Sequence, residues 1–278
     1  MRPSASRPLR PQGGLDADAL EHYRDGAWYD AEYIHIGGDV PYYTRVASET
    51  EGPLLELAAG TGRLTLPMAR ATPFEVVGLD LSTGMIARAE EKAKALPQPV
   101  QARLRFVAGD MRIARLGREF EAVVLAFNTL MHMTEDEDLE AMLETVRVHL
   151  RPTGLFHLDL HTPYPAMLTD RDPAGRYDPQ QMIDPHTRER WEVSENSRYD
   201  PRRQINTMSF FYRRVGATGT PFGPEKQLDL SLRVIFPREL DRWLSAGGFE
   251  VVGDWEDFGR ALSFSGRGGR RVLACRKR

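Results

Sequence analysis

The sequence contains a single cysteine, Cys275, so it can form neither an intrachain disulfide nor a cysteine-based zinc site. Cysteine scarcity suits a reducing compartment, and we expect a cytoplasmic protein. No apolar run is long enough to span a bilayer. A net charge of −3 provides no basic field for nucleic acid or a membrane surface. These absences favour a protein that acts on small molecules.

The composition is that of an ordinary globular protein. Apolar residues make up 41% of the 278 residues and charged residues 28%, which allows a sizeable core in one large domain or a domain with an insertion. Residues 1–14 are rich in Arg, Pro and Ser and lack the apolar segment of a signal peptide. We expect a flexible tail there and a single domain over residues 15–278.

Apolar runs alternate with helical patterns through the first part of the chain. A parallel sheet that is buried on both faces produces continuous apolar strands of this kind, with helices between them. Two more apolar runs, at 249–255 and 271–275, are expected to close the sheet. The sequence therefore predicts an α/β fold of Rossmann-like type, with a mostly parallel seven-stranded sheet and helices on both faces. The five alternating runs are residues 53–57, 74–79, 103–107, 122–127 and 155–160.

The pattern changes between residues 161 and 235. Residues 162–181 are rich in Pro and Asp and are interpreted as a loop. Residues 188–197, 204–215 and 227–235 then alternate polar and apolar side chains, as antiparallel strands do. We interpret 161–235 as an antiparallel β insertion after the fifth strand, with a role in substrate binding.

Each predicted parallel strand ends in polar or small residues. In sheets of this type, ligands bind beyond the carboxyl ends of the strands. We therefore expect the ends of the five strands to converge on one site. These end residues are Glu56 and Gly60, Asp80, Asp110, Asn128, and Asp159 with His161.

The loop after the first strand reads Ala58-Ala59-Gly60-Thr61-Gly62, and such small residues let a backbone pass close to a ligand. Glu56 is an acid in an apolar strand, which is costly unless a polar partner is present. Asp80 follows about twenty residues later, where a carboxylate can accept ribose hydroxyls. Alone, these residues could form only a tight turn and a helix cap.

Two further residues fit a nucleotide site. Asp110 could accept the exocyclic amine of an adenine, and Met111 could pack on the ring. The alternative is an acid in an ordinary turn. Thr65 stands where a dinucleotide fingerprint requires Gly or Ala, which disfavours a nicotinamide dehydrogenase.

Taken together, the motifs resemble those of the class I S-adenosylmethionine-dependent methyltransferases, over residues 54–160. Further motifs resemble the N,N-dimethyltransferases of deoxyaminosugar biosynthesis, and the layout is also similar to that of glycine and sarcosine N-methyltransferases. The insertion shows no such likeness, so the resemblance does not identify the substrate. These further motifs are Tyr29-Asp30-x-x-Tyr33, residues 118–123, His132-Met133 and Ser265-Gly266-Arg267-Gly268.

The resemblance implies S-adenosylmethionine as cofactor and a role for each matching residue. Glu56 would face the methionine end, Asp80 the ribose, and Asp110 with Met111 the adenine. Tyr33 would lie over the cofactor near the methyl group, His132 beside the acceptor, and Arg267 would reach the pocket from the last hairpin. The implied cofactor-binding residues are Glu56, Ala58, Gly60, Gly62, Asp80, Leu81, Met85, Asp110, Met111 and Asn128.

The implied catalytic residues keep their simpler alternatives. A histidine can take the proton that an amine loses on methylation, but His132 could instead only shape the pocket. Tyr33 could be core packing, and Arg267 could lie in a surface turn. His157, Asp159 and His161 alternate on one strand, but one strand seldom supplies three metal ligands, so no metal is expected.

The sequence thus predicts methyl transfer to a small molecule, with nitrogen favoured over oxygen as acceptor. A catalytically idle S-adenosylmethionine-binding module is the other alternative, which a substrate-binding insertion would argue against. We expect no nucleic-acid or membrane partner, and a homodimer is left open.

Overall fold

The computed structural model describes residue 15, residues 17–169 and residues 171–278. The expected flexible tail, residues 1–14, lies outside this part of the chain. Within the described residues, no helix is long and apolar enough to cross a membrane.

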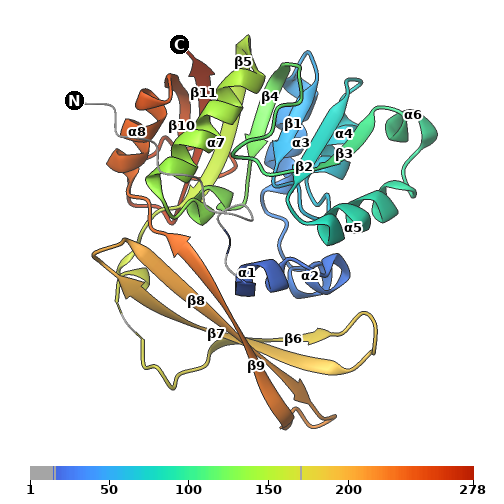
Figure 1. Cartoon of the computed structure of the whole chain (residues 1–278), viewed down its shortest axis with the longest axis vertical. Coiled ribbons are helices and arrows are strands. Elements are labelled where there is room, and N and C mark those ends of the chain that lie inside the picture. The colour runs from blue at the N-terminus through green and yellow to red at the C-terminus, as the bar shows by residue number, and fades with distance from the viewer. Residues whose placement is uncertain (1–14, 16, 170) are drawn as a thin grey trace.

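The main sheet has seven strands in the order β10-β11-β5-β4-β1-β2-β3 (Figure 1). Strands β3, β2, β1, β4 and β5 pair in parallel, while β11 is antiparallel to both β5 and β10. The predicted Rossmann-like fold with a closing strand pair is confirmed. The strands are β1 Leu54–Leu57, β2 Val76–Asp80, β3 Leu104–Ala108, β4 Phe120–Leu125, β5 Leu150–His161, β10 Phe249–Trp255 and β11 Arg270–Lys277.

Helices cover both faces of this sheet. On one face, α7 and α8 pack on side chains such as Leu55 and Val123. On the other, α3 and α4 pack on Leu54 and Val124. Successive side chains of a strand alternate between faces, so Glu56 lies on the same face as Leu54, beneath α4. The helical elements that accompany the main sheet are α3 Val40–Glu49, α4 Thr65–Ala71, α5 Thr83–Ala93, α6 Gln98–Gln101, α7 Asp136–His149, α8 Pro237–Ala246 and the 3-10 turn η2 Thr129–His132.

A separate four-stranded antiparallel sheet, ordered β6-β7-β8-β9, lies between β5 and α8 in the chain and below the main sheet in Figure 1. The predicted strands at 188–197, 204–215 and 227–235 correspond to β7 Arg190–Asp200, β8 Ile205–Val215 and β9 Pro221–Arg233. A short 3-10 turn, η3 Pro165–Met167, precedes them.

Strand β6 Tyr177–Ile183 begins inside the region interpreted as a loop, so that interpretation was wrong there. Among the described strands it is an edge strand paired with β7 alone, and its ladder is interrupted between Tyr177 and Gln180. Asp178 there has a left-handed backbone and Pro179 follows it. Edge strands tolerate such residues, and they hide the alternating pattern.

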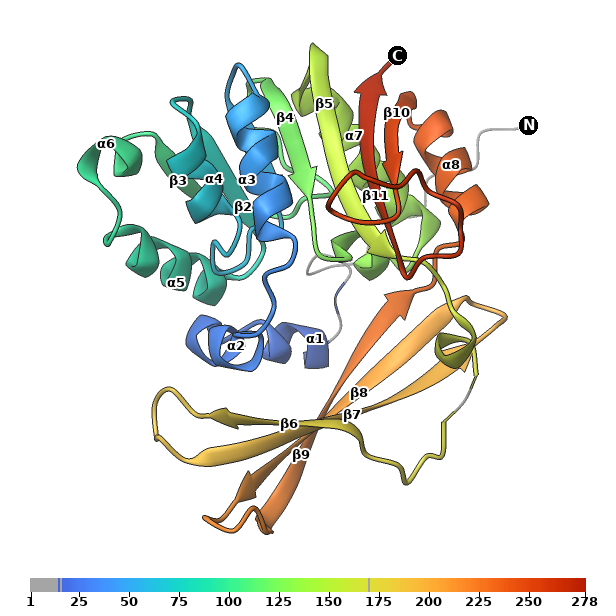
Figure 2. The same ribbon diagram turned by 180° about the vertical axis from the view of Figure 1, so that it is seen from behind.

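Two short helices, α1 Ala17–His22 and α2 Gly26–Glu32, lie between the main sheet and the antiparallel sheet (Figures 1 and 2). The Asp18 carboxylate of α1 accepts a hydrogen bond from the Asp229 amide of β9. On the other side, the Ser82 hydroxyl at the start of α5 donates to the Tyr23 carbonyl at 2.6 Å. The segment 17–32 therefore joins the two sheets.

Close backbone contact at Gly84 holds this segment. A Cβ added to Gly84 would lie 1.9 Å from the Arg24 carbonyl oxygen, a distance that forces the backbone to move. Glycine is thus required on this face of α5, although alanine would by itself favour the helix by about 0.5–1 kcal/mol.

Replacing Gly84 by alanine should therefore displace segment 17–32 while leaving the main sheet intact. We expect faster tryptic cleavage after Arg24, with a cooperative thermal transition retained. Gly37→Ala is the matched control, because nothing lies within 4 Å of a Cβ at that position. Equal cleavage rates in Gly84→Ala and wild type would contradict this account of the contact.

Candidate active site

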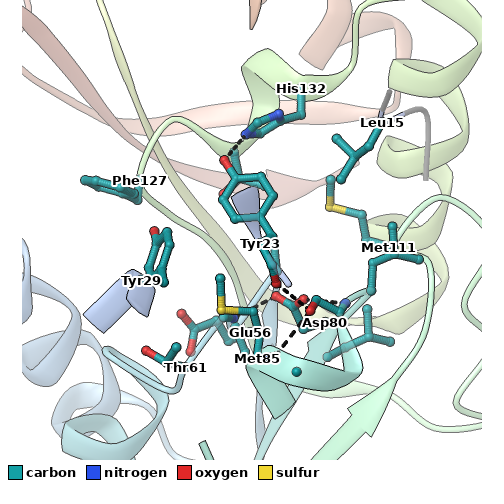
Figure 3. Close-up of a pocket in the computed structure, with 18 of the residues that line it drawn as sticks. Leu15, Tyr23, Tyr29, Glu56, Thr61, Asp80, Met85, Met111, Phe127 and His132 are labelled. Carbon is teal, nitrogen blue, oxygen red and sulfur yellow. Dashed lines mark hydrogen bonds between the residues drawn. The ribbon is translucent and has the colours of Figure 1, made fainter. Parts of the chain in front are cut away.

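A cavity of about 430 Å³ lies at the carboxyl edge of the parallel strands (Figure 3). Its walls come from the ends of β1, β2, β3 and β4, the start of α5, and segment 17–32. We call it the first cavity. It contains nine of the predicted site residues: Glu56, Ala58, Gly60, Asp80, Leu81, Met85, Asp110, Met111 and His132.

The loop after β1 forms one wall of the first cavity. Ala58, Gly60 and Gly62 have backbone φ angles of 55°, 56° and 76°, a left-handed conformation that costs an alanine energy and a glycine little. Gly62 does not line the cavity. It turns the chain into α4 against Leu66 and Ala89.

Asp80 fixes this loop from the neighbouring strand. One carboxylate oxygen accepts a hydrogen bond from the Gly60 amide at 2.7 Å, and the other accepts from the Ser82 amide at 2.8 Å. Burial raises the pKa of Asp80, and the backbone hydrogen bonds from Ser82 and Gly60 oppose this shift. A carboxylate has about four lone-pair positions, so Asp80 retains capacity for further donors.

Glu56 is 3% exposed, and the Thr65 hydroxyl donates a hydrogen bond to it. Burial raises the pKa of Glu56 to about 8, against the effects of Thr65 and the nearby Arg63. Arg63 itself is held by a two-point ion pair with Asp39 at 2.5 and 2.7 Å. The carboxyl group is therefore suited to a cationic ligand, because such a partner would favour its ionised form.

Asp110 and Met111 follow β3 at the far side of the first cavity. The Asp110 carboxylate accepts hydrogen bonds from Arg112, including one of 2.7 Å. Arg112 is buried and also pairs with Asp138 at 2.5 Å. This network fixes the direction of the Asp110 side chain.

A second cavity, of about 280 Å³, adjoins the first. One wall is the antiparallel sheet. The side chains there follow the two-residue period of strands, so they share one face: Glu195 and Ser197 of β7 lie opposite Phe210 and Met208 of β8. Tyr33, Asn128 and His161 line the same cavity.

Four side chains line both cavities: Tyr23, Tyr29, Phe127 and His132. The Tyr23 hydroxyl lies 3.1 Å from His132 Nε2, within hydrogen-bonding distance. In Figure 3 a dashed line joins the Tyr23 hydroxyl to His132 above it, and Tyr29 lies below Phe127. These four residues, which we call the shared wall, lie where the two cavities adjoin.

Besides Gly62, the structure places three predicted residues away from the first cavity. Tyr33 lines the second cavity and stacks on Tyr29, with ring centres 4.5 Å apart. Asn128 also lies there, and its amide oxygen accepts a hydrogen bond from the His161 amide at 2.7 Å. Arg267 is exposed and lines neither cavity.

An adjacent arginine, Arg270, points inward instead of Arg267. It pairs with Asp159, and its guanidinium lies 3.4 Å from His161 Nε2. The turn that carries Arg267 is held at the protein surface by a hydrogen bond of 2.5 Å from the Ser265 amide to the Glu256 carboxylate.

Asp159 lies near the carboxyl end of β5 and lines neither cavity. Its carboxylate is buried and accepts hydrogen bonds from the Tyr43 hydroxyl at 2.6 Å and the Phe127 amide at 3.0 Å. Phe127 and Asn128 both have left-handed backbones, which the contacts from β5 support. His157 is also buried, with Tyr42 at 3.2 Å. Among the described residues, no group of three or more ligand-type side chains is arranged to hold a metal ion.

Tyr23 and Phe127 line both cavities but were not predicted as site residues, and Tyr29 was named only within a motif. Phe127 had a signal, because it ends an apolar strand directly before Asn128. Tyr23 had none that is readable locally, since its position depends on the docking of segment 17–32.

Known proteins resemble this chain in sequence and in fold. Residues 54–154 match the model of a methyltransferase domain family. The chain is 32% identical over 154 residues, 54% of its length and 56% of the relative's, to dTDP-3-amino-3,6-dideoxy-alpha-D-glucopyranose N,N-dimethyltransferase of Streptomyces fradiae. It is 31% identical over 124 residues, 45% of its length and 48% of the relative's, to dTDP-3-amino-3,4,6-trideoxy-alpha-D-glucopyranose N,N-dimethyltransferase of Streptomyces venezuelae.

The chain spans about half the length of these curated relatives. Among solved structures, it is similar to the CcbJ methyltransferase from Streptomyces caelestis, with a TM-score of 0.70 and 26% identity over 92% of this chain and 98% of that one. Fold, motif set and relatives agree with the expected family and with S-adenosylmethionine as its methyl donor. The matched methyltransferase domain, the sugar N,N-dimethyltransferase relatives and the fold support a class I S-adenosylmethionine-dependent methyltransferase close to the deoxyaminosugar N-methyltransferases.

Proposed function

We propose that this protein transfers a methyl group from S-adenosylmethionine, bound in the first cavity, to an amine nitrogen of a small molecule bound in the second. The observation that carries the proposal is the shared wall. Two adjoining cavities, one with the cofactor motifs and one lined in part by the antiparallel sheet, share four side chains. A donor and an acceptor held on either side of it would have their reacting groups close together, and such positioning can supply roughly 7–11 kcal/mol of a barrier.

The residues of the first cavity fit this cofactor. Glu56 offers a buried carboxyl group for the cationic amino acid end, Asp80 an acceptor for the ribose, and Asp110 with Met111 an edge and a face for the adenine. The bound cofactor would supply a methyl group activated by a sulfonium.

The second cavity supports a small acceptor with a polar part. Glu195, Ser197 and Asn206 provide polar atoms, and Met208, Leu230 and Leu232 provide an apolar surface. Domain 161–235 would thus serve as the substrate-binding insertion. Nitrogen is the preferred acceptor because both sugar relatives are named as N,N-dimethyltransferases.

Residues of the shared wall would orient the acceptor and exclude water. The Tyr23–His132 pair could accept a proton or a hydrogen bond from the acceptor nitrogen. Phe127 and Tyr29 would restrict the nitrogen to one approach. Tyr33, beside Tyr29 in the second cavity, would act on the acceptor side.

A direct test uses methyl-labelled S-adenosylmethionine and two matched acceptors, dTDP-3-amino-3,6-dideoxyglucose and its 3-hydroxy counterpart. We expect label on the amine and none on the alcohol. Label on the alcohol alone would favour O-methylation. Cofactor binding with no transfer to these acceptors or to a wider amine panel would support an idle binding module and overturn the proposal.

Replacing Asp80 by alanine should weaken S-adenosylhomocysteine binding by about 10- to 100-fold. This range corresponds to about 1.5–3 kcal/mol for hydrogen bonds to a charged group, and the Gly60 loop loses its anchor as well. Calorimetry measures the affinity, with Glu140→Ala on the exposed side of α7 as control. Unchanged affinity in Asp80→Ala would exclude Asp80 from the cofactor site.

Binding of the cofactor should also release a proton at neutral pH. With a pKa of about 8, Glu56 is mostly protonated at pH 7 in the free protein, and pairing with the ligand ammonium requires its ionised form. Affinity for S-adenosylhomocysteine should therefore rise between about pH 6 and 8.

Calorimetry in two buffers of different ionisation enthalpy measures that proton. Glu56→Gln should remove the release and flatten the affinity between pH 6 and 8. Proton release that persists in Glu56→Gln would assign the titration to another group.

A further inference from the structure

A series of hydrogen bonds leads from the second cavity to the carboxylate of Glu32, at the end of α2. The Tyr33 hydroxyl lies 3.1 Å from His22 Nε2, and His22 Nδ1 lies 3.1 Å from the Tyr212 hydroxyl. The Tyr212 hydroxyl in turn lies 3.2 and 3.3 Å from the two Glu32 oxygens. Tyr33 lines the cavity, and Glu32 is partly exposed.

We propose that Tyr33, His22, Tyr212 and Glu32 form a proton relay, which carries the proton released by amine methylation out of the second cavity to Glu32. The inference rests on the proposed N-methyltransferase function, because a methylated amine must lose one proton.

The carboxylate end fixes the direction of every hydrogen bond in the relay. An ionised Glu32 can only accept, so the Tyr212 hydroxyl donates to it. The Tyr212 oxygen can then accept from His22 Nδ1–H, which leaves Nε2 as the acceptor for the Tyr33 hydroxyl. All three donors point from the cavity towards Glu32.

The charge states along the chain suit such a transfer. Burial lowers the pKa of His22 to about 4, with smaller effects of His132 and Lys226, so the ring is neutral at pH 7. Burial raises the pKa of Tyr33 and Tyr212, which keeps both hydroxyls protonated. Aromatic side chains surround His22, and the centre of the Phe210 ring lies 5.2 Å from the centre of the His22 ring.

Glu32 is the group in the relay that can store the proton. Burial raises its pKa to about 7, and hydrogen bonds from Tyr212 and Trp28 oppose that shift. It can therefore take up a proton and release it near neutral pH, which is the condition for an efficient acid–base group.

Each proton and electron pair of the transfer can be accounted for. The neutral nitrogen forms a bond to the methyl carbon as the carbon–sulfur bond breaks, and the electron pair of that bond stays on sulfur. The nitrogen then gives one proton to the Tyr33 oxygen. Tyr33 passes its own proton to His22 Nε2, His22 passes the Nδ1 proton to Tyr212, and Tyr212 passes its proton to Glu32.

The Tyr23–His132 pair is the competing destination for the proton, because it lines both cavities. The two routes differ in their terminal group. The relay predicts a dependence on a carboxyl group that touches neither cavity, whereas the pair does not involve Glu32.

The central test is Glu32→Gln, which keeps a hydrogen-bond acceptor for Tyr212 but cannot store the proton. Single-turnover methyl transfer to dTDP-3-amino-3,6-dideoxyglucose is followed from pH 5.5 to 9. In wild type we expect the rate to rise through an inflection near pH 7. In Glu32→Gln we expect a rate about 10²-fold lower without that inflection, and an unchanged affinity for S-adenosylhomocysteine.

Two further variants separate proton transfer from a structural role. Tyr212→Phe removes one link and should lower the rate as much as Glu32→Gln, with no added loss in the double variant. Sodium formate should partly restore Glu32→Ala, which a structural role would not allow. Glu140→Gln, an acid on the outer side of α7, is the control.

A measurement without turnover reports on Glu32 directly. The folded protein holds a proton on Glu32 that the unfolded chain releases, so this group should lower the stability as pH rises from about 4.5 to 7. Thermal unfolding of Glu32→Gln should lack that contribution.

Failure of the relay and failure of the proposed function give different results. Wild-type rates and an intact inflection in Glu32→Gln would overturn the relay and leave N-methylation standing. Binding of the cofactor without transfer by the wild type would overturn both.

Discussion

The buried carboxylate of Asp159 is the junction on which the site geometry depends. It accepts hydrogen bonds from Tyr43 of α3 and from the Phe127 amide, and it pairs with Arg270 of β11. Three elements that are distant in sequence are thereby fixed to the end of β5. Breaking a buried ion pair of this kind costs about 3–5 kcal/mol, because one charge is left uncompensated.

The same junction supports strained backbone at the cavities. Two consecutive non-glycine residues, Phe127 and Asn128, adopt left-handed conformations, each at a cost of about 1–3 kcal/mol. Strand β5 holds both residues: the Asp159 carboxylate accepts from the Phe127 amide, and the His161 amide donates to the Asn128 side chain. The turn places Phe127 in the shared wall and starts η2, which carries His132.

Much of the cofactor half could be predicted from the sequence, because its residues directly follow parallel strands. The ends of such strands meet at one edge whatever the rest of the fold does, so Glu56, Asp80 and Asp110 lie together. This reasoning does not extend to Asn128, which follows β4 but turns its side chain towards β5.

The rest of the site depends on contacts between distant segments. Tyr23 reaches its place only when α1 packs between the two sheets, and no local pattern encodes that packing. Arg267 lies in a glycine-rich turn and Arg270 begins β11 directly after it, so the local sequence does not show which of the two reaches the pocket. Their roles are decided by the partners Glu256 and Asp159, which hold the turn outward and Arg270 inward.

Segment 17–32 also makes the two cavities interdependent. Among the described residues, those of the first cavity all lie between positions 15 and 133, so none comes from the antiparallel sheet. Changes on that sheet can thus alter the second cavity without touching the first. Tyr23 and Tyr29 belong to both, however, and sit on a segment clasped between α5 and β9. A ligand in either cavity that stabilises the docked position of this segment would raise the affinity of the other cavity for its ligand. By thermodynamic linkage the second ligand would raise the affinity for the first by the same factor.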